Sequence, residues 1–114
     1  MTMNDTIRTA LSFYGLLKYP CYANTYTGKD DTYFVFNYNV VPDDYGDDEP
    51  NHVRYLIQVH FYCPSTLNTI EIAKKVKLAL EKAGLTYPEQ VDASDEEGQH
   101  IVFECEGIEW IERE

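Results

Sequence analysis

The chain has 114 residues, of which 44% are hydrophobic and 14% aromatic. Such a chain can form one compact domain, residues 1–114, with a modest core, and it is too apolar to be disordered. Its 9 basic and 20 acidic residues give a net charge of -11, which argues against nucleic-acid binding by a basic face and against attraction to anionic lipid. Without a long apolar run or a signal peptide, we expect no membrane span and a cytoplasmic location.

The three cysteines, Cys21, Cys63 and Cys105, are odd in number, far apart and flanked by apolar or aromatic residues. This spacing is unlike that of a disulfide framework or a zinc knuckle. Unpaired cysteine is among the most buried residue types, so we expect free thiols in the core.

The first predicted element is a helix from about Asn4 to Lys18. Apolar residues recur at spacings of three and four, Asn4 and Asp5 suit a helix N-terminus, and Pro20 ends the helix. Residues 21–26, CYANTY, fit either a short edge strand or an extended segment that leads into a turn.

Two strands are predicted next, over residues 32–41 and 52–63, because both segments are rich in aromatic and β-branched residues. Alternation in the second strand assigns one set of residues to the core face. That set is Val53, Tyr55, Ile57, Val59, Phe61 and Cys63. The two strands form an antiparallel hairpin whose long acidic tip runs from Pro42 to about Asn51.

A second helix is predicted after Pro64, with Ser65 or Thr66 as its cap and Gly84 just past its end. Its core stripe consists of Ile72, Ala73, Val76, Ala79, Leu80 and Ala83. The opposite, lysine-rich face also carries Leu67 and Leu78. These two leucines are candidate subunit contacts, although Leu78 also fits an ordinary exposed leucine.

The chain closes with a loop, residues 88–98, and a strand over residues 99–111. Ile101, Phe103 and Cys105 share one face, and the shift to Ile108 and Trp110 after Gly107 indicates a bulge. The order helix, strand, strand, helix, strand predicts an α+β domain with an antiparallel sheet and two helices packed on one face.

The acidic tip holds Asp43, Asp44, Asp47, Asp48 and Glu49, which raises the question of a metal site or an acid/base site. A calcium loop of the EF-hand type needs oxygen ligands at alternate positions and glycine at the sixth. Counting from Asp43, the third position is Tyr45 and the sixth is Asp48, so the register fails. Clustered carboxylates on a polar loop stay hydrated and give little leverage for acid/base chemistry, and we interpret this stretch as a solvated hairpin tip.

Other catalytic or metal-binding patterns are also missing from the sequence. His52, His60 and His100 could meet if neighbouring strands aligned them, but their spacing matches no zinc motif. There is no glycine-rich phosphate loop and no recognisable nucleophile elbow. We therefore predict no catalytic residue, no cofactor and no metal, and a protein that is not an enzyme.

The order of elements resembles that of the small tail-terminator and tail-completion proteins of long-tailed bacteriophages and prophages. The resemblance covers nearly the whole chain: a helix ending before YPCY, the strand YFVF, Asp43 and Asp44 after it, the strand IQVHFYC, a helix ending in KAG and a closing GQHIVFECEGIEW strand.

This resemblance implies a non-enzymatic, ring-forming subunit, typically hexameric, that terminates the tail tube and joins the tail to the head. Its implied partners are copies of itself, the tail tube protein and a head-tail connector protein. The implied location is the virion tail, after assembly in the host cytoplasm. The alternatives are a small acidic ligand- or metal-binding module and a head-side connector component.

Overall fold

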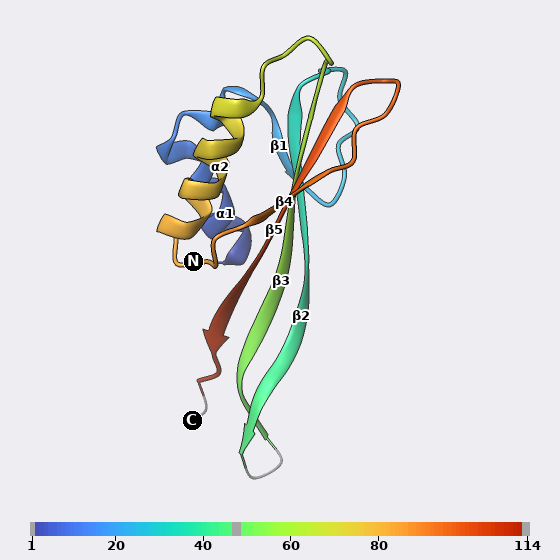
Figure 1. The fold of residues 1–114 in the computed structure, drawn as a ribbon. Helices are drawn as coiled ribbons and strands as arrows, with labels where there is room; N and C mark the ends of the chain where they lie inside the picture. The colour runs from blue at the N-terminus through green and yellow to red at the C-terminus, as the bar shows by residue number, and fades with distance from the viewer. Residues whose placement is uncertain (1, 47–48, 113–114) are drawn as a thin grey trace.

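The protein is an α+β domain in which one mixed sheet carries two helices on the same face (Figure 1). The structure is a computed structural model and describes residues 2–46 and 49–112. The elements are α1 (Met3–Phe13), the 3₁₀ turn η1 (Leu16–Lys18), β1 (Cys21–Ala23), β2 (Tyr33–Gly46), β3 (Glu49–Cys63), α2 (Ile70–Lys82), β4 (Glu89–Asp92) and β5 (Gln99–Trp110).

The five strands lie in the order β1-β2-β3-β5-β4, with β1 parallel to β2 and all other pairs antiparallel. The α+β class and the helices on one face are confirmed, but the purely antiparallel sheet and the five-element order are wrong. β1 and β4 are short additions at the two edges. Because β1 has only three residues, the segment 24–32 is long enough to run back to the start of β2. The two strands can therefore be parallel without a crossover helix.

The N-terminal helix differs from the prediction at both ends. Thr2 is the N-cap, and its side chain and that of Asp5 form a capping box. The helix ends at Phe13, where Gly15 takes a left-handed conformation with φ 69° and a separate 3₁₀ turn begins. The predicted single helix to Lys18 is therefore wrong, although Ile7, Ala10 and Leu11 are buried as their spacing predicts.

The second helix begins later than predicted, at Ile70 instead of near Ser65 or Thr66. The side chain of Asn68 accepts a hydrogen bond from the Ile70 amide at 3.1 Å. The core stripe is confirmed, with four buried members and with Ile72 and Ala83 packed partly against the core, and Gly84 follows the helix end with φ 95°. Leu67 precedes the helix and packs partly against the core, so placing it on the lysine-rich helical face is wrong.

The hairpin is longer, and its tip shorter, than the sequence predicts. β2 and β3 stay in register from Tyr33↔Tyr62 to Gly46↔Glu49, so the predicted loop from Pro42 to Asn51 is mostly paired strand. Asp47 and Asp48 of the predicted tip lie outside the described residues. The hairpin projects well beyond the helices (Figure 1), and we call its far part, residues 40–46 and 49–54, the hairpin arm.

β5 pairs with β3 one to one from Cys63↔Gln99 to His52↔Trp110, so the predicted bulge at Gly107 is wrong. Gly107 points to the core face, where an added Cβ would lie 2.6 Å from Cδ2 of Leu85. Ile108 and Trp110 lie on the opposite face simply because successive side chains alternate along a strand.

The core lies between the helices and the face of the sheet formed by even residues of β2 and odd residues of β3 and β5. Its fully buried aromatic rings come from the three central strands, and Val76 and Leu80 of α2 pack above them. These rings are Phe34, Phe36, Phe61 and Phe103. The other face of the sheet, here called the open face, has no helix over it (Figure 1).

Candidate functional surfaces

The open face carries a row of neighbouring aromatic rings, most of them stacked, that the sequence patterns did not predict. The row crosses the sheet from β1 through the 24–32 loop, β2 and β3 to β5, with successive ring centroids 4.1 to 5.0 Å apart. We call it the ring ladder; in order it consists of Tyr22, Tyr26, Tyr33, Tyr62, His100 and His60. The signal in the sequence was alternation, since Tyr62 and His60 occupy positions between the core residues of β3.

Two of the three histidines meet: pairing of β3 with β5 brings His60 and His100 together on the open face. Nδ1 of His60 lies 2.8 Å from Nε2 of His100, and Nε2 of His60 lies 3.4 Å from Nδ2 of Asn37. Burial lowers the pKa of both histidines, while the carboxylates of Asp92 and Asp95 oppose that shift at His100. The pair is therefore neutral at pH 7 and links β2, β3 and β5.

His52 does not join this pair. It lies on the hairpin arm, 3.7 Å from the Asp43 carboxylate and with its ring 5.0 Å from that of Trp110. Within residues 2–46 and 49–112, the structure assembles no group of three or more His, Cys, Asp or Glu side chains that could hold a metal ion.

Part of the predicted acidic tip, including Asp43 and Glu49, belongs to the paired strands of the hairpin arm. Oδ2 of Asp43 also lies 3.7 Å from Nη1 of Arg54, whose Nε is 3.4 Å from Oε1 of Glu106 on β5. Asp43 thus ties the hairpin together, while Glu49 begins β3 opposite Gly46. Exposed ion pairs of this kind contribute little stability, so their main effect is to orient the side chains across the three strands.

The three thiols are free, as predicted: Cys63 and Cys105 are buried and Cys21 is half-buried. Burial raises the pKa of all three, to about 12 for Cys105. A protonated thiol is a poor nucleophile and a poor metal ligand, so the cysteines are suited to packing.

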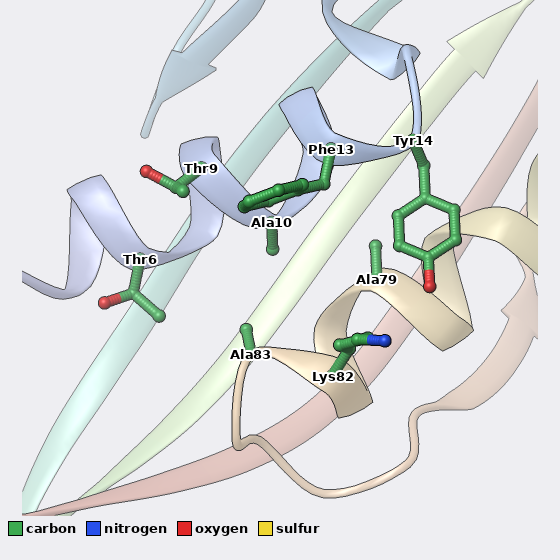
Figure 2. Close-up of a pocket in the computed structure, with 8 residues that line it drawn as sticks. All are labelled: Thr6, Thr9, Ala10, Phe13, Tyr14, Ala79, Lys82 and Ala83. Carbon is green, nitrogen blue, oxygen red and sulfur yellow. The ribbon is translucent and has the colours of Figure 1, made fainter.

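A shallow apolar groove of about 510 Å³ lies between α1 and α2 (Figure 2). Its floor is formed by small side chains, Ala10, Ala79 and Ala83, and Phe13 stands at its side with 82% of its surface exposed. Lys82 is the charged group that lines it. The groove contains no arrangement of polar groups that would perform chemistry.

The candidate interface leucines differ in exposure. Leu78 on α2 is 46% exposed and available to a partner, whereas Leu67 contributes part of its surface to the core. Two further apolar residues that the sequence patterns did not single out, Ile108 and Trp110 at the end of β5, are 54% and 62% exposed. They are on the open face because β5 pairs with β3 without a bulge. The predicted bulge at Gly107 would have turned them to the core face.

Among the described helices, none is long and apolar enough to cross a membrane. A comparison with protein-family models found no matching family, and a comparison with curated proteins found no matching relative.

Proposed function

We propose that this protein is a non-enzymatic structural subunit that forms a ring on the end of a long-tailed phage tail and joins the tail to the head. The proposal is motivated by the order of the predicted elements, which resembles that of tail-terminator and tail-completion proteins. One observation of the structure supports it best. At the end of the sheet that carries the hairpin arm, two strand edges are unpaired by the described strands: that of β2 at one margin of the sheet and that of β5 at the other.

The first edge belongs to β2. β1 covers it over Phe34 to Phe36, and the last contact is the hydrogen bond from the Asn24 amide to the Phe36 carbonyl at 2.8 Å. Beyond it, Tyr38 and Val40 direct their main-chain groups outward, where no described strand pairs with them. Pro42, the next residue of this series, has no N–H group and limits how far a neighbour can pair.

The second edge belongs to β5. β4 covers it over Ile101 to Glu104, and Thr86 then pairs with Glu106 through its amide and its hydroxyl. Past this point Ile108 and Trp110 form an edge that none of the described strands covers, with exposed apolar side chains beside it.

A ring needs exactly such a pair of unlike surfaces, because each subunit contacts its two neighbours through different faces. A strand edge of one copy can pair with the other edge of the next by main-chain hydrogen bonds. Leu78 and the exposed Ile108 and Trp110 then supply neutral contact area, which a subunit of charge -11 requires to offset repulsion. Tail tube and head-tail connector proteins are the partners at the two ends of the ring.

Disrupting the gene in the phage that encodes this chain should leave filled heads and separate tails in electron micrographs. Complementation with Val40→Pro, which removes an outward main-chain donor, should fail, whereas Val40→Thr at the same position should restore joined particles. Normal virions without the protein would overturn the proposal. Antibody labelling at the head vertex of tailless heads, instead of on free tail ends, would identify a head-side connector component.

A further inference from the structure

The end of the open face opposite the hairpin arm forms a pocket of about 340 Å³ between two acidic loops. One loop connects β1 to β2 and contributes Asp30 and Asp31; the other connects β4 to β5 and contributes Asp95 and Glu97. In Figure 1 both loops lie on the side of the sheet away from the helices. Tyr33, Tyr62 and His100 of the ring ladder line the pocket between them.

The pocket is strongly negative. Four carboxylates line it, and none of its lining residues is a lysine or arginine. Lys29 precedes Asp30 in the chain, but it is not one of the lining residues. Burial lowers the pKa of His100, so this side chain adds no compensating charge at pH 7. Such a surface attracts a cationic group and repels phosphate.

Contacts along the sheet hold the aromatic wall of the pocket. The rings of Tyr33 and Tyr62 stack at 4.9 Å, and that of Tyr62 stacks on His100 at 4.1 Å. The hydroxyl of Tyr26 donates to Asp30 at 2.7 Å and so connects the ladder to the acidic loop. Stacked rings lose little conformational freedom on binding, which favours their use in recognition.

We propose that this pocket docks an arginine-bearing segment of a partner protein. A guanidinium group is planar, weakly hydrated and rich in donors, so it can bind carboxylates on two sides while its alkyl stem rests on tyrosine rings. The ammonium group of lysine is a strongly hydrated point charge, so we expect lysine to bind less tightly between the carboxylates and the tyrosine rings.

A second copy of this chain is a poorer occupant, because its described arginines are already engaged. Arg8 donates to the carbonyl of Cys21 at 3.4 Å and lies over the ring of Phe36. Arg54 lies close to the carboxylates of Asp43 and Glu106. The pocket is also at the far end of the sheet from the open strand edges, so ring formation and arginine docking can be tested separately.

The test is a ¹H–¹⁵N NMR titration of the purified chain with the peptide acetyl-Gly-Arg-Gly-Arg-Gly-amide. The expected result is a saturable shift of the amides of Asp31, Gly98 and His100. The same peptide with citrulline in place of arginine keeps the shape and loses the charge, and it should bind at least about tenfold more weakly, a difference of about 1.4 kcal/mol. Equal binding of the two peptides, or no shift at these amides, would overturn the proposal.

Matched variants separate the pocket from the overall negative charge. Asp31→Asn combined with Glu97→Gln should weaken the arginine peptide about tenfold or more, while Glu71→Gln combined with Glu81→Gln on α2 changes net charge equally and should have little effect. Equal weakening by both charge pairs would show attraction to net charge only and contradict the pocket. Sedimentation of the chain without peptide, unchanged by the pocket variants, excludes a second copy as the occupant.

Discussion

Phe61 and Tyr62 are neighbours on β3 but belong to opposite faces of one sheet. Phe61 is fully buried beneath the helices, whereas Tyr62 lies half-buried in a ring ladder that no helix covers. On the core face, apolar side chains interlock with α1 and α2; on the open face, stacked rings, amides and carboxylates are ordered by contacts along the sheet. Most buried apolar side chains therefore lie on the core face, and on the open face only Val35 and Val102 among the described apolar residues are buried.

The sharpest test of this comparison is a pair of substitutions at these neighbouring positions. Phe61→Ala should cost about 3–5 kcal/mol of unfolding free energy, because it leaves a cavity in the core. Tyr62→Ala should cost on the order of 1 kcal/mol, roughly the value of the lost aromatic contacts. Urea unfolding of both variants measures the two values, and equal losses would mean that the open face is a second core.

A second pair compares the two faces of α2. Leu80 is fully buried, whereas Leu78 on the same helix has nearly half of its surface exposed. Leu80→Ala should therefore cost about 2–5 kcal/mol, and Leu78→Ala should stay within about 0.5 kcal/mol of the wild type. A loss below about 1 kcal/mol for Leu80→Ala would place the core stripe elsewhere.

The core face can also be tested where the sequence prediction went wrong, at Gly107. The added methyl of Gly107→Ala would lie 2.6 Å from Leu85 Cδ2, so Leu85 has to move, and we expect a cost of about 1–3 kcal/mol. Gly46→Ala on the exposed arm is the control, since its Cβ would meet the Asn51 side chain at 3.4 Å. Thermal unfolding of both variants gives the comparison. If Gly107→Ala is as stable as the wild type, β5 does not pack against Leu85 as described.

The smallest expected effect is the pH dependence of the open face. Burial lowers the folded-state pKa of His60 and His100 from 6.5, so below that value the unfolded chain binds more protons and stability falls as the pH decreases. The lowered pKa values of Asp5 and Asp92 act only near and below 3.8, outside this window.

The melting temperature should therefore drop between about pH 7.5 and about pH 5.5, and the drop should shrink in His100→Asn, which removes one titrating group. Calorimetry of both proteins across this range tests the expectation. An unchanged slope in the variant would mean that the histidine pair does not govern the pH dependence.

The sequence predicted the core face well because side-chain periodicity carries that information. The alternation from Ile57 to Cys63 and the stripe from Ala73 to Leu80 each repeat with the period of their element, whereas the predicted core residue Val53 lies on the arm outside the core. The segment of β1 fitted either an edge strand or an extended segment, and the prediction of a loop over residues 88–98 is wrong because β4 lies within it. Three or four residues with polar neighbours are too short to show a period. Their position depends on pairing with β2 and β5, which no local pattern encodes.

The candidate surfaces were harder to predict for the same reason. Tyr33, Tyr62 and His100 are far apart in the sequence, and strand register alone brings their rings into one row. The arm was read as a loop because its acidic residues and prolines are typical of turns, although β2 and β3 remain paired through it. Such errors arise because cross-strand partners, unlike helical periodicity, are set by the whole sheet.

The proposal that assembly uses surfaces outside the core is tested most directly at Leu78. The measurement is the fraction of tails joined to heads, counted in electron micrographs of particles assembled with Leu78→Glu, with Leu78→Ala as the control. We predict that Leu78→Glu leaves most tails unjoined while the purified variant keeps the wild-type melting temperature, because the new charge enters the ring contact and not the core. Joining at the wild-type yield by Leu78→Glu, or unfolding of the purified variant, would contradict the proposal.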